Sequence, residues 1–270
     1  KSEVPLGRQA HEWIPEVGYV TRLAVLSGTG MNALASDMVA DGTESSELRI
    51  DSQWGQVPAI LVDTGDGEVL FIDRHHRDDE SRTPPHEIEY RANVHAAASF
   101  RPDLILSINS VGTMREDLPP GDIGIAVDVL DLSIRPWTFH DDDAIHADRT
   151  NIFDEKANQI CKSTLLTQQQ NVVDGLIVAQ CIGPQFESPA EIDALVRLGA
   201  DVVGMTLGPE SRLVAESGLP HVALSCSSNW AAGRTPGDRD AVIDHHAVDS
   251  MAASMRNRVA ACIIELLQSL

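Results

Sequence analysis

The chain has 270 residues, 43% of them hydrophobic, which suits an α/β protein with one sizeable buried core. Its 41 acidic and 20 basic residues give a formal net charge of -21, and such a surface repels nucleic-acid phosphates and disfavours DNA or RNA as a partner. No apolar run approaches the roughly 20 residues of a membrane span, and the first residues lack a signal-peptide pattern. The four cysteines form no CxxC pair, and we expect them to be reduced and buried thiols. We therefore expect a cytoplasmic protein with no membrane partner.

Apolar runs alternate with helical patterns along the whole chain, which is typical of an α/β sheet. In chain order we predict strands at 20–26, 59–63 and 69–72, a helix at 87–100, strands at 103–108 and 123–130, an irregular stretch at 131–153, and a helix at 154–169. There follow a strand at 176–182, a helix at 189–198, a strand at 201–205, a helix at 209–217 with Gly218 as its C-cap, a strand at 221–225, and a helical region at 240–267 with a break. We predict a single domain over residues 1–270, with 1–20 as an N-terminal extension.

Two short motifs are suited to an anion. Ser27-Gly28-Thr29-Gly30 follows the first strand; its glycines let the backbone approach an anion, and the Thr29 hydroxyl can donate to it. Arg74-His75-His76 follows a later strand, and the planar donor fork of arginine matches phosphate oxygens. Taken alone, the first motif could equally be a strand-to-loop turn and the second a solvated loop. Both follow strands, and open α/β sheets place their ligands at strand ends.

Three further motifs carry side chains suited to a nucleoside. Phe186-Glu187 follows an apolar strand, where an aromatic ring can stack a purine and a carboxylate can accept its N–H. Met205-Thr206 stands at another strand end, although such a Met is usually part of a core and Thr206 could be an N-cap. Asn229 can donate and accept at once and so can bind a purine edge, but turns also favour Asn. None of the three motifs is specific alone.

Rival chemistries find less support in the sequence. Cleavage of a sugar bond by two carboxylates is one rival, but among 41 acidic residues no pair stands out. The histidines His140 and His146 lack the spacing of a metal-binding motif, and no GxSxG nucleophile motif is present. We therefore predict no metal site.

The order and spacing of the motifs resemble the trimeric purine nucleoside phosphorylase and methylthioadenosine phosphorylase family. The resemblance runs from about Leu23 to Ser254. It is carried by Ser27-Gly28-Thr29-Gly30-Met31, Arg74-His75, Pro84 to Asn93, Asn109 to Gly112 with Pro120-Gly121-Asp122-Ile123, Arg135-Pro136 to Phe139, Gly183 to Glu187, and Gly199 through Met205-Thr206 to Glu210. It implies an α/β fold with a mixed, twisted β-sheet flanked by helices, and a homotrimer with active sites near the subunit interfaces.

The resemblance also implies a role for each site residue. Phosphate is expected against Thr29, Arg74, His75, Ser110 and Thr206. The nucleoside is expected against Phe186, Met205, His146 and His245, with His146 lent by a neighbouring subunit and His245 near the 5′ position. Glu187 and Asn229 are expected to bind the purine and to be the catalytic residues. Inorganic phosphate is the implied co-substrate, without a metal or an organic cofactor.

The pair Glu187 and Asn229 resembles the 6-oxopurine branch of the family, since members that use 6-aminopurines carry Ser and Asp at these positions. A carboxylate accepts the N1–H of hypoxanthine or guanine, whereas adenine has no hydrogen there and would leave two acceptors facing each other. Asn229 can donate to O6 and accept from a protonated N7. We therefore expect phosphorolysis of inosine, guanosine or 5′-methylthioinosine, in purine salvage, to the free purine and ribose 1-phosphate or its 5′-methylthio analogue.

Two alternatives stay open. One is phosphorolysis of methylthioadenosine or another 5′-deoxy nucleoside, which the Glu187–Asn229 pair disfavours. The other is a weakly active nucleoside-binding paralogue, which rests on the acidic run Asp78-Asp79-Glu80, where the family usually carries a histidine. Those charges either weaken phosphate binding by repulsion or point to solvent. The 5′ substituent is also open, because His245 indicates a polar pocket while Ile243 and Val248 indicate an apolar one.

Overall fold

A computed structural model describes residues 20–39, 44–77 and 81–270, so the expected extension at 1–20 and the acidic run at 78–80 lie almost wholly outside the described residues. The strands are β1 (Arg22–Ser27), β2 (Glu44–Ser52), β3 (Gly55–Asp63), β4 (Glu68–Asp73), β5 (Leu104–Thr113), β6 (Ile123–Asp131), β7 (Asp174–Gln180), β8 (Val202–Gly204) and β9 (His221–Trp230). The helices are α1 (Leu34–Met38), the 3₁₀ turn η1 (Pro85–Glu87), α2 (Tyr90–Ser99), α3 (Glu155–Leu166), α4 (Pro189–Arg197), α5 (Leu207–Ser217), α6 (His245–Ser254) and α7 (Arg256–Ser269).

The strands form one mixed sheet in the order β2-β3-β4-β1-β5-β8-β7-β6-β9. Because β9 also pairs with β5, the strands β5, β8, β7, β6 and β9 close into a ring, and β2 to β1 extend from it as an open arm. Strands β1, β4, β5 and β9 run parallel to one another, so their carboxyl ends lie at one edge. Strand β8 runs against β5 and returns its own carboxyl end toward the middle of that long strand.

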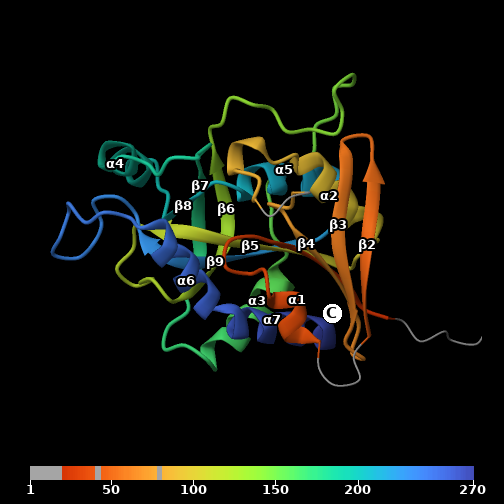
Figure 1. Cartoon of the computed structure of the whole chain (residues 1–270). Coiled ribbons are helices and arrows are strands. Elements are labelled where there is room, and N and C mark those ends of the chain that lie inside the picture. The colour runs from red at the N-terminus through yellow and green to blue at the C-terminus, as the bar shows by residue number, and fades with distance from the viewer. Residues whose placement is uncertain (1–19, 40–43, 78–80) are drawn as a thin grey trace, which may run out of the picture.

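Helices cover both faces of the sheet (Figure 1). One face carries α1, α3 and α7, whose apolar residues share a cluster with Leu23, Leu106 and Leu224. The other face carries α2 and α5, which pack over a second cluster that includes Ala24, Leu26 and Ile105. Alternate residues of β1 and β5 therefore serve opposite cores, so both strands are buried on two sides and read as continuous apolar runs. The expected α/β class, with a mixed sheet flanked by helices, is confirmed.

Strand β2 and helix α1 were not predicted, the first because it buries little apolar surface and the second because it is short. Strand β2 pairs along its whole length with β3, yet all nine of its residues are exposed or half-buried. Helix α1 has only five residues, too few to show a helical period. The predicted strands at 103–108 and 221–225 are also too short, because β5 and β9 continue through polar residues that face the site described below.

The predicted ends of two helices are confirmed by their local chemistry. Helix α4 begins at a capping box in which the Ser188 hydroxyl accepts from Glu191 N and the Glu191 carboxylate accepts from Ser188 N. Helix α5 ends at Gly218, whose φ of 67° lies in the left-handed region. In the described part of the chain, none of the helices combines the length and the apolar character that crossing a bilayer requires.

We predict that Gly218→Ala lowers the free energy of unfolding by about 1 kcal/mol, because only the left-handed backbone opposes the new methyl group. A Cβ built at Gly218 meets nothing within 4 Å, so no clash adds to that cost. Urea unfolding of the two proteins measures the difference. Gly218→Asn is the matched control and should lose less, since Asn tolerates this conformation; equal losses for Ala and Asn would contradict the account.

Candidate functional site

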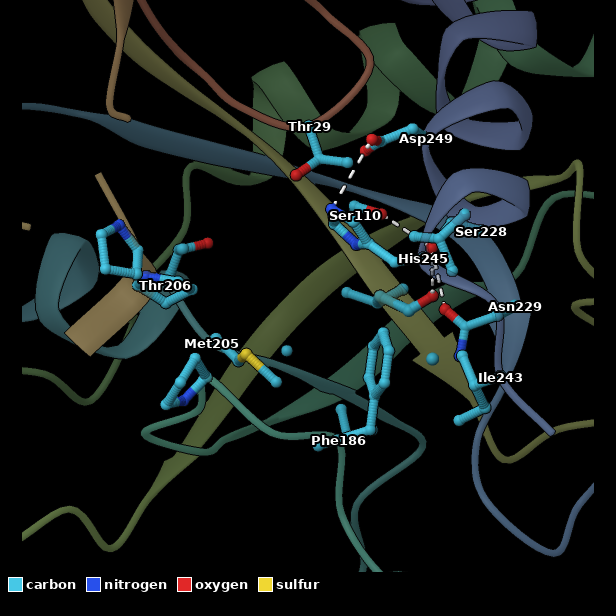
Figure 2. A pocket seen from close by; sticks show the side chains of 18 of the residues that line it. Thr29, Ser110, Phe186, Met205, Thr206, Ser228, Asn229, Ile243, His245 and Asp249 are labelled. Carbon is cyan, nitrogen blue, oxygen red and sulfur yellow. Dashed lines mark hydrogen bonds and ion pairs between the residues drawn. The ribbon is translucent and has the colours of Figure 1, made fainter. Parts of the chain in front are cut away.

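A cavity of about 450 Å³ opens beside the last residues of β5, where the carboxyl ends of β1, β4 and β9 also lie (Figure 2). Strand β8 and the loop before α4 supply its floor, and the first turn of α6 closes one side. Its walls include ten of the eleven site residues that the sequence analysis predicted: Thr29, Arg74, His75, Ser110, Phe186, Glu187, Met205, Thr206, Asn229 and His245. Residues separated by more than 200 positions in the chain thus share one cavity.

Arg74 is 2% exposed and its guanidinium is already engaged by the protein. Its Nε donates to Glu210 Oε1 at 2.6 Å, and Nη2 donates to Glu210 Oε2 at 3.2 Å and to Leu26 O at 2.7 Å. Its Nη1 donates to Ile108 O at 2.8 Å. A guanidinium has five N–H groups, so an anion in the cavity meets the one remaining N–H of Nη1. The fork that the sequence suggested for phosphate is turned toward Glu210 instead.

The glycine of the first motif makes this arrangement possible. A Cβ placed on Gly28 would lie 2.5 Å from Arg74 Nη1 and 3.5 Å from His75 Nε2. Any larger residue at Gly28 would therefore push the loop after β1 away from the two basic side chains. Close approach of backbone to a charged group is the physical reason for glycine at this position.

His75 is a neutral imidazole at physiological pH. Its Nδ1 lies 2.8 Å from Thr83 O, and since a carbonyl only accepts, Nδ1 carries the hydrogen and Nε2 is left as an acceptor. Burial is the main reason that its pKa falls from 6.5 to about 4, and the nearby Arg74 lowers it further. The cavity therefore offers an anion the N–H of Arg74 as a donor and Nε2 of His75 as an acceptor. This combination suits an anion that carries a proton, such as hydrogen phosphate.

Two polar residues that the sequence analysis gave no role hold Thr206 and Asn229. Asn109 Nδ2 donates to Thr206 Oγ1 at 2.7 Å. Ser110 Oγ donates to Ser228 Oγ at 2.7 Å, and Ser228 Oγ lies 3.0 Å from Asn229 Oδ1. Asn109 lies in a stretch that carries the family resemblance, and Ser228 stands next to Asn229, but neither received a role from the sequence.

Glu187 lines the cavity from the loop between β7 and α4. Among the residues that the structure describes, its buried Oε1 finds no hydrogen-bond partner. Burial is the first cause that raises the pKa of Glu187, and the thiol of Cys181 partly offsets this by a hydrogen bond. A carboxylate oxygen that is dry and unpaired is suited to accept an N–H from a ligand. Phe186, 40% exposed, stands beside it as a free aromatic face.

Asn229 lines the cavity near Phe186 and Ile243, away from Thr206 (Figure 2). Its Oδ1 faces the Ser228 hydroxyl, and its Nδ2 donates to Trp230 O at 2.9 Å. One N–H of the amide and one lone pair of Oδ1 remain for a ligand. Gly112 keeps this side open, because a Cβ there would lie 3.2 Å from Asn229 Nδ2.

The start of α6 lines the cavity with both polar and apolar groups. His245 Nε2 lies 3.7 Å from Asp249 Oδ2, one helical turn away, while Ile243 and Val248 offer apolar surface. His146 does not reach this cavity. It is exposed on the irregular stretch between β6 and α3, so the structure brings all the predicted site residues together except His146.

Comparisons with known proteins agree with this geometry. A family model described as the Phosphorylase superfamily matches residues 46–268. The chain is 34% identical over 216 residues to a probable S-methyl-5′-thioinosine phosphorylase of Methanopyrus kandleri, covering 79% of this chain and 80% of the relative. It is 31% identical over 222 residues to a 6-oxopurine nucleoside phosphorylase of Pyrococcus furiosus, covering 78% and 80%. A methylthioadenosine phosphorylase from Schistosoma mansoni in complex with adenine superimposes with a TM-score of 0.80 over 92% of this chain and 90% of that one; at 20% identity this shows the fold alone.

We predict that Glu187→Gln raises the melting temperature at neutral pH. The pKa of Glu187 is raised in the folded protein, so its ionised form costs stability above that pKa, and the cost vanishes below the unfolded value of 4.5. Thermal unfolding at about pH 7.5 and pH 4 should therefore show a gain that disappears at the lower pH. Glu191→Gln is the control, because hydrogen bonds from Ser188 lower the pKa of Glu191 and no gain is expected. An equal gain at both pH values would sink the assignment.

Proposed function

This chain belongs to the phosphorylase superfamily, as the order of its motifs predicted, and on that premise we propose that it cleaves 6-oxopurine nucleosides with inorganic phosphate. It would act as a pentosyltransferase on inosine, guanosine or 5′-methylthioinosine. One observation carries the proposal: a buried, unpaired Glu187 oxygen and the Asn229 amide share a cavity with Arg74, His75 and Thr206. Glu187 and Asn229 suit the edge of a purine, and the other three residues suit an anion.

The purine end supports an oxopurine over an aminopurine. Glu187 Oε1 can accept the N1–H of hypoxanthine or guanine, while adenine would present a second acceptor and leave two lone pairs opposed. The remaining N–H of Asn229 can donate to O6 or to N7. Both relatives named above, the thioinosine and the 6-oxopurine phosphorylase, act by name on oxopurines.

The proposed reaction is a nucleophilic substitution at C1′. The bond from C1′ to N9 breaks and its electron pair leaves on the purine, and a phosphate oxygen supplies the pair for the new C1′–O bond. Asn229 would stabilise the developing negative charge at N7, and Glu187 would hold N1–H; one such preorganised donor is worth about 3–4 kcal/mol of the barrier. The proton that the purine gains balances the proton that hydrogen phosphate loses on becoming the sugar phosphate, and water can carry it between them. Thr29, Arg74, His75, Ser110 and Thr206 would hold the phosphate beneath the sugar, which removes the entropy cost of bringing the nucleophile to C1′.

The 5′ end of the site allows two substrate types within this proposal. His245 and Asp249 suit a 5′-hydroxyl, while Ile243 and Val248 suit a methylthio group. Methylthioadenosine is the alternative substrate, but the Glu187–Asn229 pair works against it for the reason given above. The second alternative, a weakly active binding paralogue, rested on residues 78–80, which lie outside the described residues.

We further propose a homotrimer in which His146 reaches the site of a neighbouring subunit. His146 is exposed and lies in a stretch whose apolar side chains Leu132, Ile134 and Ile145 are 67%, 93% and 48% exposed. Such a run of exposed apolar residues is typical of a subunit interface. A cytoplasmic place in purine salvage completes the proposal, with no metal or organic cofactor required by the chemistry described.

The experiment that tests the function is phosphate-dependent release of base from five nucleosides: inosine, guanosine, adenosine, methylthioadenosine and methylthioinosine. We expect hypoxanthine or guanine to appear only when phosphate is present, and the relative rates of inosine and methylthioinosine to identify the 5′ group. Release of adenine would contradict the purine assignment. Binding of inosine without any turnover would favour the paralogue.

We predict that Asn229→Asp lowers the rate on the best 6-oxopurine nucleoside by about 10²-fold, because a carboxylate cannot donate to O6 or to the N7 of the leaving purine. Steady-state rates with saturating phosphate measure the loss. Asn171→Asp is the control, since its exposed side chain donates to Asp117 O at a distance from the cavity. An unchanged rate for Asn229→Asp would mean that Asn229 does not bind the purine.

A further inference from the structure

Asn109 is a buried polar residue to which the proposed reaction assigns no role. It lies in β5, 2% exposed, behind the wall of the cavity and not in it. Its Nδ2 donates to Thr206 Oγ1 at 2.7 Å, a bond that joins β5 to the first residue before α5. Its Oδ1 is buried and pairs with nothing in the described part of the protein.

The direction of this bond decides what Thr206 can do. An amide N–H only donates, so the Thr206 oxygen accepts from Asn109 and keeps its own proton for another partner. Thr206 is the N-cap residue of α5, yet its side chain makes no cap hydrogen bond. A threonine in this position usually accepts from a backbone N–H of the first turn. Asn109 thus holds the hydroxyl away from the helix, and Thr206 lies in the wall of the cavity at its anion end.

Stability alone gives no reason for an amide at this position. A buried carbonyl oxygen without a partner costs more free energy than the single hydrogen bond to Thr206 is expected to return. Leucine has nearly the shape of asparagine and would remove the unpaired oxygen. An asparagine that carries this cost is expected where its N–H has a task.

We propose that Asn109 is a positioning residue that orients the Thr206 hydroxyl as a hydrogen-bond donor to the phosphate co-substrate. The inference rests on the proposed function, because it assigns the anion of that reaction to Thr206. It concerns binding of phosphate and not of the nucleoside, since the Asn109 side chain bonds to Thr206, whereas Asn229 bonds to Ser228 and Trp230. Loss of Asn109 should therefore affect one substrate only.

The test compares Asn109→Leu with the wild type in KM for phosphate, KM for the nucleoside and melting temperature. We expect KM for phosphate to rise about tenfold, as for the loss of one hydrogen bond to a charged group, while KM for the nucleoside stays within about twofold and the protein stays folded. Asn109→Asp should raise KM for phosphate further, because a carboxylate would accept the Thr206 proton and add a negative charge near the anion. Asn109→Ala carries the same test if the leucine variant does not fold.

A double-mutant cycle separates positioning from packing. If Asn109 acts through Thr206, then Asn109→Leu should add nothing to the loss caused by Thr206→Val. Asn158→Leu on α3 is the matched control, because its side-chain oxygen also lacks a partner among the described residues and it lies outside the cavity wall. Additive losses, an unchanged KM for phosphate, or an equal rise in both KM values would overturn the proposal. A wild-type protein without phosphate-dependent turnover would instead overturn the proposed function itself.

Discussion

The ion pair between Arg74 and Glu210 holds together the strands and the helix that carry the anion-binding residues. It links the end of β4 to α5, and the same guanidinium binds carbonyls at the end of β1 and in β5. Both side chains are almost fully buried, at 1% and 0% exposure. Removing either partner would leave an unpaired buried charge, which costs about 3–5 kcal/mol. The position of the anion-binding groups therefore depends on this contact more than on any loop.

The same contact limits how the protein can attract phosphate. Glu210 neutralises most of the charge of Arg74, and His75 is held neutral by burial. The chain as a whole carries a net charge of -21. Long-range attraction thus contributes little, and short hydrogen bonds with fixed direction must supply the affinity. Thr206, oriented by Asn109, is the donor that we propose, and Arg82, which pairs with Asp73 at 3.1 Å, also lines the cavity.

The sequence predicted the sheet well where its strands are buried and poorly where they are not. Strands β1 and β4 are continuous apolar runs and were found almost to the residue, whereas β2 has no buried side chain and gave no signal. The gathering of Arg74 and Asn229 in one cavity also followed from motif order. The hydrogen bonds that Asn109 and Ser228 make with Thr206 and Asn229 did not, because contacts of this kind leave no spacing pattern in one chain. Nor could motif matching show that the Nε and Nη2 groups of Arg74 already donate to Glu210.

The residues proposed for the purine and for the anion share one feature, a hydrogen-bonding group that the protein itself leaves without a partner. At the purine end, Glu187 keeps a dry acceptor that is costly in the empty protein and is satisfied by an N–H donor. At the anion end, the N–H that Asn109 donates to Thr206 leaves the proton of the Thr206 hydroxyl free for a ligand. In each case the empty site stores an unmet hydrogen bond, and a ligand of the right polarity recovers it. For the proposed function, selectivity for an oxopurine and for an anion would arise from the penalty that a mismatched ligand leaves in place.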